Sequence, residues 1–93
     1  MKLTLHAQER MNLRGINKPM IDIVLQYGEI IQDKYYLSSV KARQLLQQMK
    51  FDRDRHANNH YILQLIQKII DKGGVVVVEA ENKVITCYAY AGY

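Results

Sequence analysis

The sequence predicts an α+β fold in which an N-terminal helical hairpin and further helices pack on a small antiparallel sheet that ends in a C-terminal β-hairpin. Three observations predict it. Apolar residues recur at helical spacing in several stretches, glycines and capping residues stand at the ends of those stretches, and a β-branched run at 75–78 precedes a turn and a second strand pattern. The 93 residues suffice for one domain, which we place at residues 1–93.

The first part of the chain predicts the helical hairpin over residues 7–28, and the alternation at residues 2–5 allows a short strand before it. Gly15 is suited to end the first helix, because glycine accepts the left-handed backbone of a helix terminus. Asn17 can cap the second helix and Gly28 can close it. These residues predict a tight corner between two short helices.

The middle of the chain predicts one strand and two helices. Residues 29–38 are rich in aromatic and β-branched residues but alternate poorly, so we expect an irregular strand there. Ser38 or Ser39 can cap a third helix that runs to about Met49, and after a polar loop an asparagine at 58–59 can cap a fourth. The expected core residues of these two helices are Val40, Leu45, Leu46, Met49, Ile62, Leu65, Ile66, Ile69 and Ile70.

The C-terminal part predicts the β-hairpin. The unbroken valine run at 75–78 indicates a strand that is covered on both faces. Asn82, in a turn at 79–83, is suited to positive φ. The returning strand covers 84–90. Strict alternation would place Val84, Thr86, Tyr88 and Tyr90 on one face and Ile85, Cys87, Ala89 and Ala91 on the other.

The composition excludes several classes of protein. A single cysteine, Cys87, cannot form an internal disulfide, and no apolar run approaches the roughly 18 residues that span a bilayer. The N-terminus lacks the long apolar stretch of a signal peptide, so we expect a cytoplasmic protein without membrane contact. The chain has no glycine-rich phosphate loop, GxSxG or CxxC pattern, which argues against NTPase, hydrolase and redox functions.

Positive charge is segregated along the chain, whose net charge is +4. Residues 1–18 and 41–56 carry most of the excess of Lys and Arg, whereas the stretch from residue 73 onwards leans acidic. A basic face favours polyanions, because contacts with phosphates release counterions. The sequence therefore indicates RNA as a candidate partner, although a solvated basic surface is an alternative.

One constellation has a spacing that suggests chemistry. His6, Arg10 and Arg14 stand four residues apart, so on a helix they lie along one slowly turning stripe. Arginine can hold a phosphate and stabilise its developing charge, and histidine can transfer a proton. Because the ribose 2′-hydroxyl is itself a nucleophile, such a site would cleave RNA with no metal or other cofactor. The alternative is a surface helix whose arginines pair with carboxylates such as Glu9 or Asp22, or with Glu79 of the sheet.

The stretch at 6–16 resembles the signature of a bacterial family called domain of unknown function 4258. That signature reads His-Ala, two residues, Arg-Met, two residues, Arg-Gly-Ile, and this chain matches its seven fixed positions. The C-terminal valine strand, turn and final strand also resemble the family, which looks like a relative of the small ribonuclease toxins of the barnase–colicin–RelE group. The resemblance implies helices against an antiparallel sheet, metal-independent RNA cleavage, and site residues His6, Arg10 and Arg14, with Thr86 and Tyr88 on the last strand.

Other candidate residues have weaker patterns. His56 and His60 are four apart, but Glu does not follow His56, so the HExxH metalloprotease pattern is absent and we expect no metal site. Arg53 and Arg55 could extend an RNA-facing surface. Cys87 is best read as a packed side chain. The seven tyrosines can pack the sheet or stack on bases.

Three functions remain open from the sequence. The first is a metal-independent endoribonuclease related to toxins, in which an acidic antitoxin-like protein would be a further partner. The second is a non-catalytic module that keeps the fold and binds nucleic acid or protein. The third is a protein-interaction domain that works through its tyrosine-rich sheet. The stripe of His6, Arg10 and Arg14 favours the first.

Overall fold

The computed structural model describes residues 2–51 and 60–89. Its helices are α1 (Leu5–Arg14), α2 (Lys18–Tyr27), α3 (Ser39–Phe51) and α5 (His60–Asp71), and its strands are β1 (Lys2–Leu3), β2 (Glu29–Ile31), β3 (Lys34–Ser38), β4 (Gly74–Ala80) and β5 (Lys83–Ala89). The α+β prediction, with its N-terminal helical hairpin and C-terminal β-hairpin, is confirmed.

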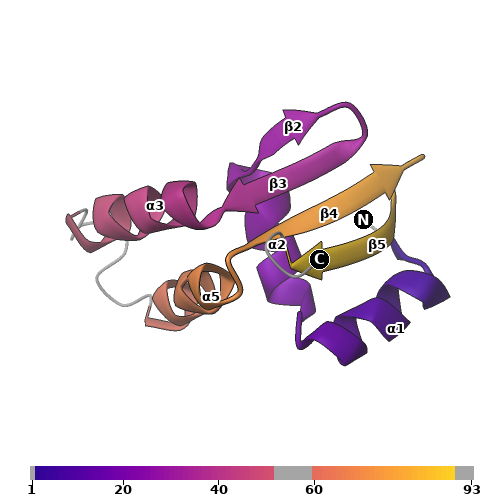
Figure 1. The fold of residues 1–93 in the computed structure, drawn as a ribbon, viewed down its shortest axis with the longest axis horizontal. Helices are drawn as coiled ribbons and strands as arrows, with labels where there is room; N and C mark the ends of the chain where they lie inside the picture. The colour runs from indigo at the N-terminus through magenta and orange to yellow at the C-terminus, as the bar shows by residue number, and fades with distance from the viewer. Residues whose placement is uncertain (1, 52–59, 90–93) are drawn as a thin grey trace.

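The strands form one five-stranded sheet in the order β1-β5-β4-β3-β2. Strands β2 to β5 pair antiparallel, but β1 pairs parallel with β5, so the sheet is mixed and not wholly antiparallel as predicted. Helix α1 packs along β5, α2 packs on β3 and β4, and α3 and α5 lie side by side where β3 ends and β4 begins (Figure 1). The first and last strands of the described chain, β1 and β5, are therefore neighbours at one edge of the sheet, where α1 also packs.

The N-terminal hairpin forms for the predicted reasons. Gly15 adopts a left-handed φ of 64°, and its N–H and that of Ile16 donate to the carbonyl of Met11. The Asn17 side chain accepts from the N–H of Met20 at 3.0 Å. Helix α1 begins two residues earlier than predicted, because Thr4 supplies an N-cap that the apolar spacing does not reveal.

Residues 29–38 form a hairpin and not a single irregular strand. Strands β2 and β3 pair through Ile30 and Tyr35, and Gln32 makes the turn with a φ of 57°. The alternation in this stretch is poor because β2 is exposed on all its residues and the turn interrupts the pattern. The strand content of the prediction was right and its continuity was wrong.

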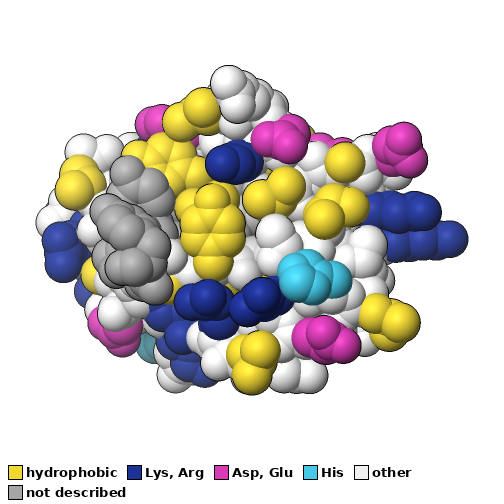
Figure 2. Space-filling model, turned by 45° about the vertical axis from the view of Figure 1, so that its right-hand side comes forward, with side chains coloured by type: hydrophobic (Ala, Val, Ile, Leu, Met, Phe, Trp, Pro, Cys, Tyr) yellow, Lys and Arg dark blue, Asp and Glu magenta, His cyan; other side chains and the backbone are white. Residues whose placement is uncertain are grey.

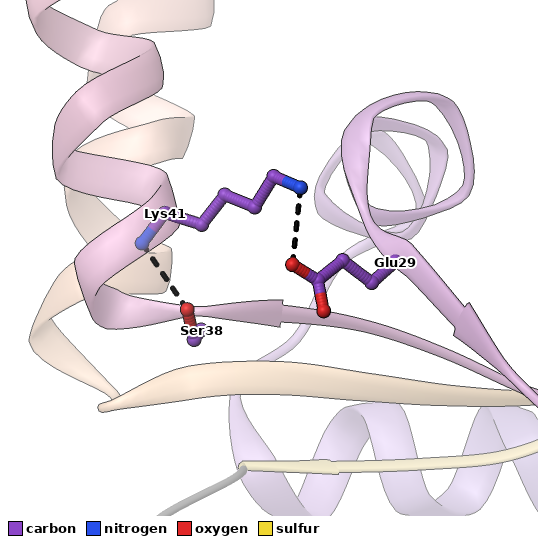
Figure 3. Close-up of polar contacts among 3 residues, drawn as sticks. All are labelled: Glu29, Ser38 and Lys41. Atoms are coloured by element: carbon purple, nitrogen blue, oxygen red, sulfur yellow. Dashed lines mark hydrogen bonds and ion pairs between the residues drawn. The ribbon is translucent and has the colours of Figure 1, made fainter.

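Strand β3 leads directly into α3. The Ser38 hydroxyl accepts from the N–H of Lys41 at 3.1 Å, and the Lys41 ammonium forms an ion pair with Glu29 at 3.1 Å (Figure 3). Val40 was wrongly predicted in the core, since it is 62% exposed. Ala42 is buried in its place, because α3 turns the face of Ala42 and Met49 inward toward α5.

The core is one contiguous cluster to which the helices and the sheet contribute. Helix α5 has the most regular apolar face, and its buried residues are Leu65, Ile66, Ile69 and Ile70, while Ile62 is partly buried. In β4, Val75, Val76 and Val77 are buried, which confirms that both faces of this strand are covered.

The C-terminal hairpin turns at Glu81 and Asn82, both of which have positive φ, as a two-residue hairpin turn requires. The register shifts between Val78 and Glu79, since Val78 pairs with Thr86 and Glu79 pairs with Val84. Ile85 is thus an extra residue in β5. This β-bulge interrupts the alternation, so the face assigned to Val84 was wrong: Val84 is fully buried, whereas Thr86 and Tyr88 are half-buried.

Some of the predicted features lie outside the described residues. These are the positions Arg53, Arg55, His56, Asn58, Asn59, Tyr90 and Ala91. Among the helices that the structure describes, none combines the length and the apolar character that crossing a bilayer requires.

Candidate functional site

A groove of about 290 Å³ opens between α1 and β5. Helix α1 contributes His6, Arg10 and Arg14, and β5 contributes Thr86 and Tyr88. Cys87 and Ala89 complete the lining. Figure 2 views this side of the molecule and shows a histidine side chain beside a row of Lys and Arg side chains. The structure therefore brings together the three motif residues of α1 and the two weaker candidates of β5.

Helix α1 is held in place at both of its ends by hydrogen bonds to distant parts of the chain. At the N-terminus, the Thr4 hydroxyl accepts from the N–H of Ala7 and donates to the carbonyl of Ile85, each at 3.1 Å. At the C-terminus, the Lys72 ammonium donates to the carbonyl of Arg14 at 2.7 Å. The Thr4 hydroxyl thus donates to the carbonyl of the bulge residue, Ile85. The contacts at the two ends fix the helix that carries the stripe of His6, Arg10 and Arg14.

The stripe faces the groove because the next face of α1 is buried. Ala7 and Met11 are buried four residues apart, and each directly follows a residue of the stripe. His6 is exposed, while Arg10 and Arg14 are half-buried. One turn of the helix thus separates each of the three groups from the next, which gives a linear site along the groove.

The charged side chains among the described residues that line the groove are all positive. None of the described residues that line it is acidic. In the part of the chain that the structure describes, the ion pairs are Lys18–Asp22 and Lys41–Glu29, so the alternative in which Arg10 and Arg14 pair with carboxylates is not seen. The Arg14 Nε is buried and has no hydrogen-bond partner among the described residues. No carboxylate among the described residues therefore competes with an anion for either guanidinium group.

Replacing Thr4 with valine removes a helix cap and a tie to the sheet at once. We expect the free energy of unfolding to fall by about 1–2 kcal/mol, because the N–H of Ala7 and the carbonyl of Ile85 both lose their partner. Equilibrium denaturation in urea measures this change. The matched variant Thr4→Ser keeps the hydroxyl and should stay near the parent, and equal losses in both variants would contradict the assignment.

Cys87 forms part of the floor of the groove. Burial raises the pKa of its thiol, and the nearby positive charge of Arg14 lowers it by less. The side chain is fully buried and pairs across the sheet with Val77. The thiol is therefore protonated at neutral pH and packs as a small apolar group, as the sequence predicted.

The raised pKa of Cys87 has a consequence for stability at high pH. Above the ordinary value of 9.0 the unfolded chain loses the thiol proton while the folded chain keeps it. The unfolded state then binds fewer protons, so the free energy of unfolding falls as pH rises, by at most ~1.4 kcal/mol for each pH unit. Below the ordinary value both states keep the proton and this dependence is absent.

Urea denaturation of the parent and of Cys87→Ala between pH 7 and 10 tests this dependence. All other titratable groups are common to the two proteins, so their contributions cancel in the difference. We expect the stability difference between the two proteins to be constant up to about pH 8 and to shift against the parent above pH 9. A constant difference across the whole range would contradict a buried, protonated thiol.

A second, smaller cavity of about 160 Å³ lies between α2, β3 and α3. Its charged lining residue is Lys41, whose ammonium is already paired with Glu29. Among the described residues, no group of three His, Cys, Asp or Glu side chains could hold a metal ion. The groove between α1 and β5 is thus the better candidate site.

Sequence reasoning missed two features of this site. Lys72 gave no signal, because its partner is a backbone carbonyl 58 residues away. Ala89 lines the groove although alternation put it on the face opposite Thr86 and Tyr88. The strand pattern could not show this, because the groove lies at the edge of the sheet where the side of β5 is open to α1.

Comparison with known proteins gives a match to one family. The model of a family described as a domain of unknown function, DUF4258, matches residues 3–89. No curated protein and no solved structure matches the chain. The matched range includes α1, β5 and every described residue that lines the groove. The chain therefore belongs to the DUF4258 family.

Proposed function

We propose that the protein binds RNA in the groove between α1 and β5 and cleaves it without a metal ion. The observation that carries this proposal is the set of groups along one wall, in which His6, Arg10 and Arg14 face a groove with no acidic residue among its described lining residues. A proton-transfer group on the same helix face as two guanidinium groups, which form no ion pair with the described residues, is what cleavage of a phosphodiester needs. The motif at 6–16 resembles the DUF4258 signature, and that family in turn looks like a relative of the ribonuclease toxins, which suggests the same reaction.

In the proposed reaction, the 2′-hydroxyl oxygen of a ribose attacks the adjacent phosphorus and the bond to the 5′-oxygen breaks. The products are a 2′,3′-cyclic phosphate and a 5′-hydroxyl. His6 accepts the proton of the 2′-hydroxyl and returns it to the departing 5′-oxygen, as an imidazole can near neutral pH. Arg10 and Arg14 hold the phosphate and stabilise the charge that grows on its oxygens.

Strand β5 supplies the opposite wall of the groove. The half-buried ring of Tyr88 offers a surface on which a base can stack, and the Thr86 hydroxyl can position the ribose or a water molecule. The volume of about 290 Å³ lies at the small end of the range for ligand pockets. It suits one nucleotide of a single strand and not a duplex.

A second candidate function is RNA binding without cleavage. It is favoured by the exposure of His6, because a solvated imidazole at the end of the stripe lacks the enclosure that often accompanies catalysis. In this function the same arginines and Tyr88 hold the strand and no bond breaks.

One experiment separates the two functions. The purified protein is incubated with a labelled single-stranded RNA in EDTA, beside His6→Ala and His60→Ala. His60 is also exposed but begins α5 and does not line the groove, so its variant is a matched control. The proposal expects cyclic-phosphate products from the parent and from His60→Ala, and none from His6→Ala. RNA retention without cleavage by the parent would favour the second function, and equal cleavage by all three proteins would exclude His6.

A further inference from the structure

The Nε–H group of Arg14 is buried but has no hydrogen-bond acceptor among the described residues. Buried N–H groups in proteins almost always have an acceptor, because an unpaired donor loses its hydration without compensation. Lys72 donates to the backbone carbonyl of Arg14, so the backbone that carries this side chain at the end of the groove is anchored.

The groove indicates which acceptor is missing. A guanidinium can donate side-on, through Nε and one Nη, to two oxygens of one anion. Arg10 lies one helical turn away on the same wall, and the Thr86 hydroxyl lines the same groove from the other. The oxygens of a phosphate are arranged tetrahedrally, so they can accept from groups on both walls of the groove, whereas the two oxygens of a carboxylate lie in one plane. The described lining residues include no acidic side chain, which also favours an anionic ligand.

We propose that the Arg14 end of the groove is a phosphoryl-binding subsite, in which Nε and one Nη of Arg14 donate to two oxygens of a single phosphate group and Arg10 donates to one of the same oxygens. The guanidinium turns Nε toward the groove when the phosphate binds, since in the present arrangement Nε is covered. The inference rests on the proposed function where it takes RNA as the source of the phosphate. The subsite itself requires only a phosphate group, whichever molecule carries it.

The phosphate could be an internal diester of a strand or a terminal monoester of a nucleotide, and the two sources can be distinguished. The primary probe is inorganic phosphate, titrated against the thermal unfolding of the protein at constant ionic strength with chloride as the balancing salt. We expect the Tm to rise saturably, by about 5–10 °C at ten times the Kd, because phosphate binds the folded state alone. The same Tm titration is then made with a nucleoside 3′-monophosphate and with a 2′-deoxy dinucleotide that has no terminal phosphate. A rise with the first indicates a terminal monoester as the source, and a rise with the second indicates an internal diester.

Variants assign the effect to Arg14. Arg14→Lys and Arg14→Gln should each lose the saturable rise, because neither side chain can donate side-on from two nitrogens. Arg43 is an exposed arginine of α3 that does not line the groove, so Arg43→Lys and Arg43→Gln should keep it. A rise of equal size in the Arg14 variants, or no rise in the parent, would overturn the proposal.

A direct measurement needs no variant. In an NMR titration of the parent with inorganic phosphate, the Nε–Hε resonance of Arg14 should shift saturably, while that of Arg43 stays in place. An unmoved Arg14 resonance would overturn the subsite. Phosphate binding at Arg14 in a protein that does not cleave RNA would refute the proposed reaction alone, whereas RNA cleavage without phosphate binding at Arg14 would refute the subsite alone.

Discussion

Replacing Arg14 with lysine is expected to slow RNA cleavage by about 10²–10³-fold, which is the effect of removing one preorganised donor from a site of developing charge. The substitution keeps the positive charge, so the attraction of the groove for RNA remains. It removes the planar fork of donors that holds two oxygens of a phosphate at once. The expected loss in the rate of cleavage is therefore larger than the loss in the retention of RNA at low salt.

The matched control for this prediction is Arg43→Lys. Arg43 is exposed on α3, away from the groove, and its replacement changes the same atoms without touching the site. Single-turnover cleavage of a labelled RNA in EDTA measures the rate, and filter retention at several salt concentrations measures binding. If Arg14→Lys cleaves as fast as the parent while both variants are folded, the role assigned to Arg14 is wrong.

Truncating Ile69 to alanine is expected to lower the free energy of unfolding by about 2–5 kcal/mol, which for a domain of this size is a large part of its stability. Ile69 is fully buried in the middle of the apolar face of α5, where that helix meets the core. The loss combines the transfer of the removed carbons to water with the cavity that they leave.

Ile30→Ala provides the matched control, since it removes the same atoms from a side chain that is 66% exposed on β2. Denaturation in urea should show this variant within about 0.5 kcal/mol of the parent. A similar loss in both variants would mean that the exposed strand β2 is packed against something in solution, and a small loss in Ile69→Ala would contradict the position of α5 in the core.

The elements whose ends are set by local capping or turn residues could be predicted from the sequence. Gly15 and Asn17 define the corner of the first hairpin through backbone freedom and side-chain capping, both of which act within a few residues. Helix α5 was recognised because its apolar spacing is regular over its whole length. The turn at Asn82 was recognised because few residues tolerate positive φ.

Features that depend on a partner distant in the chain could not be predicted in the same way. The parallel pairing of β1 with β5 joins opposite ends of the described chain, and two residues of alternating pattern do not specify a neighbour. The bulge at Ile85 shows no local sequence signal, and it overturned the face assigned to Val84. Val40 has the character of a core residue, but the first turn of α3 leaves it facing solvent.

The same distinction between local features and features that depend on a distant partner applies to the candidate site. The spacing of His6, Arg10 and Arg14 was enough to predict that they share one face of a helix, because the helical repeat is a local property of the backbone. The folded chain was needed to show that this face borders Thr86 and Tyr88, that neither arginine meets a carboxylate among the described residues, and that Lys72 holds the end of the helix. Charge pairing and the walls of a groove arise from packing between elements, which the order of residues along one element does not contain.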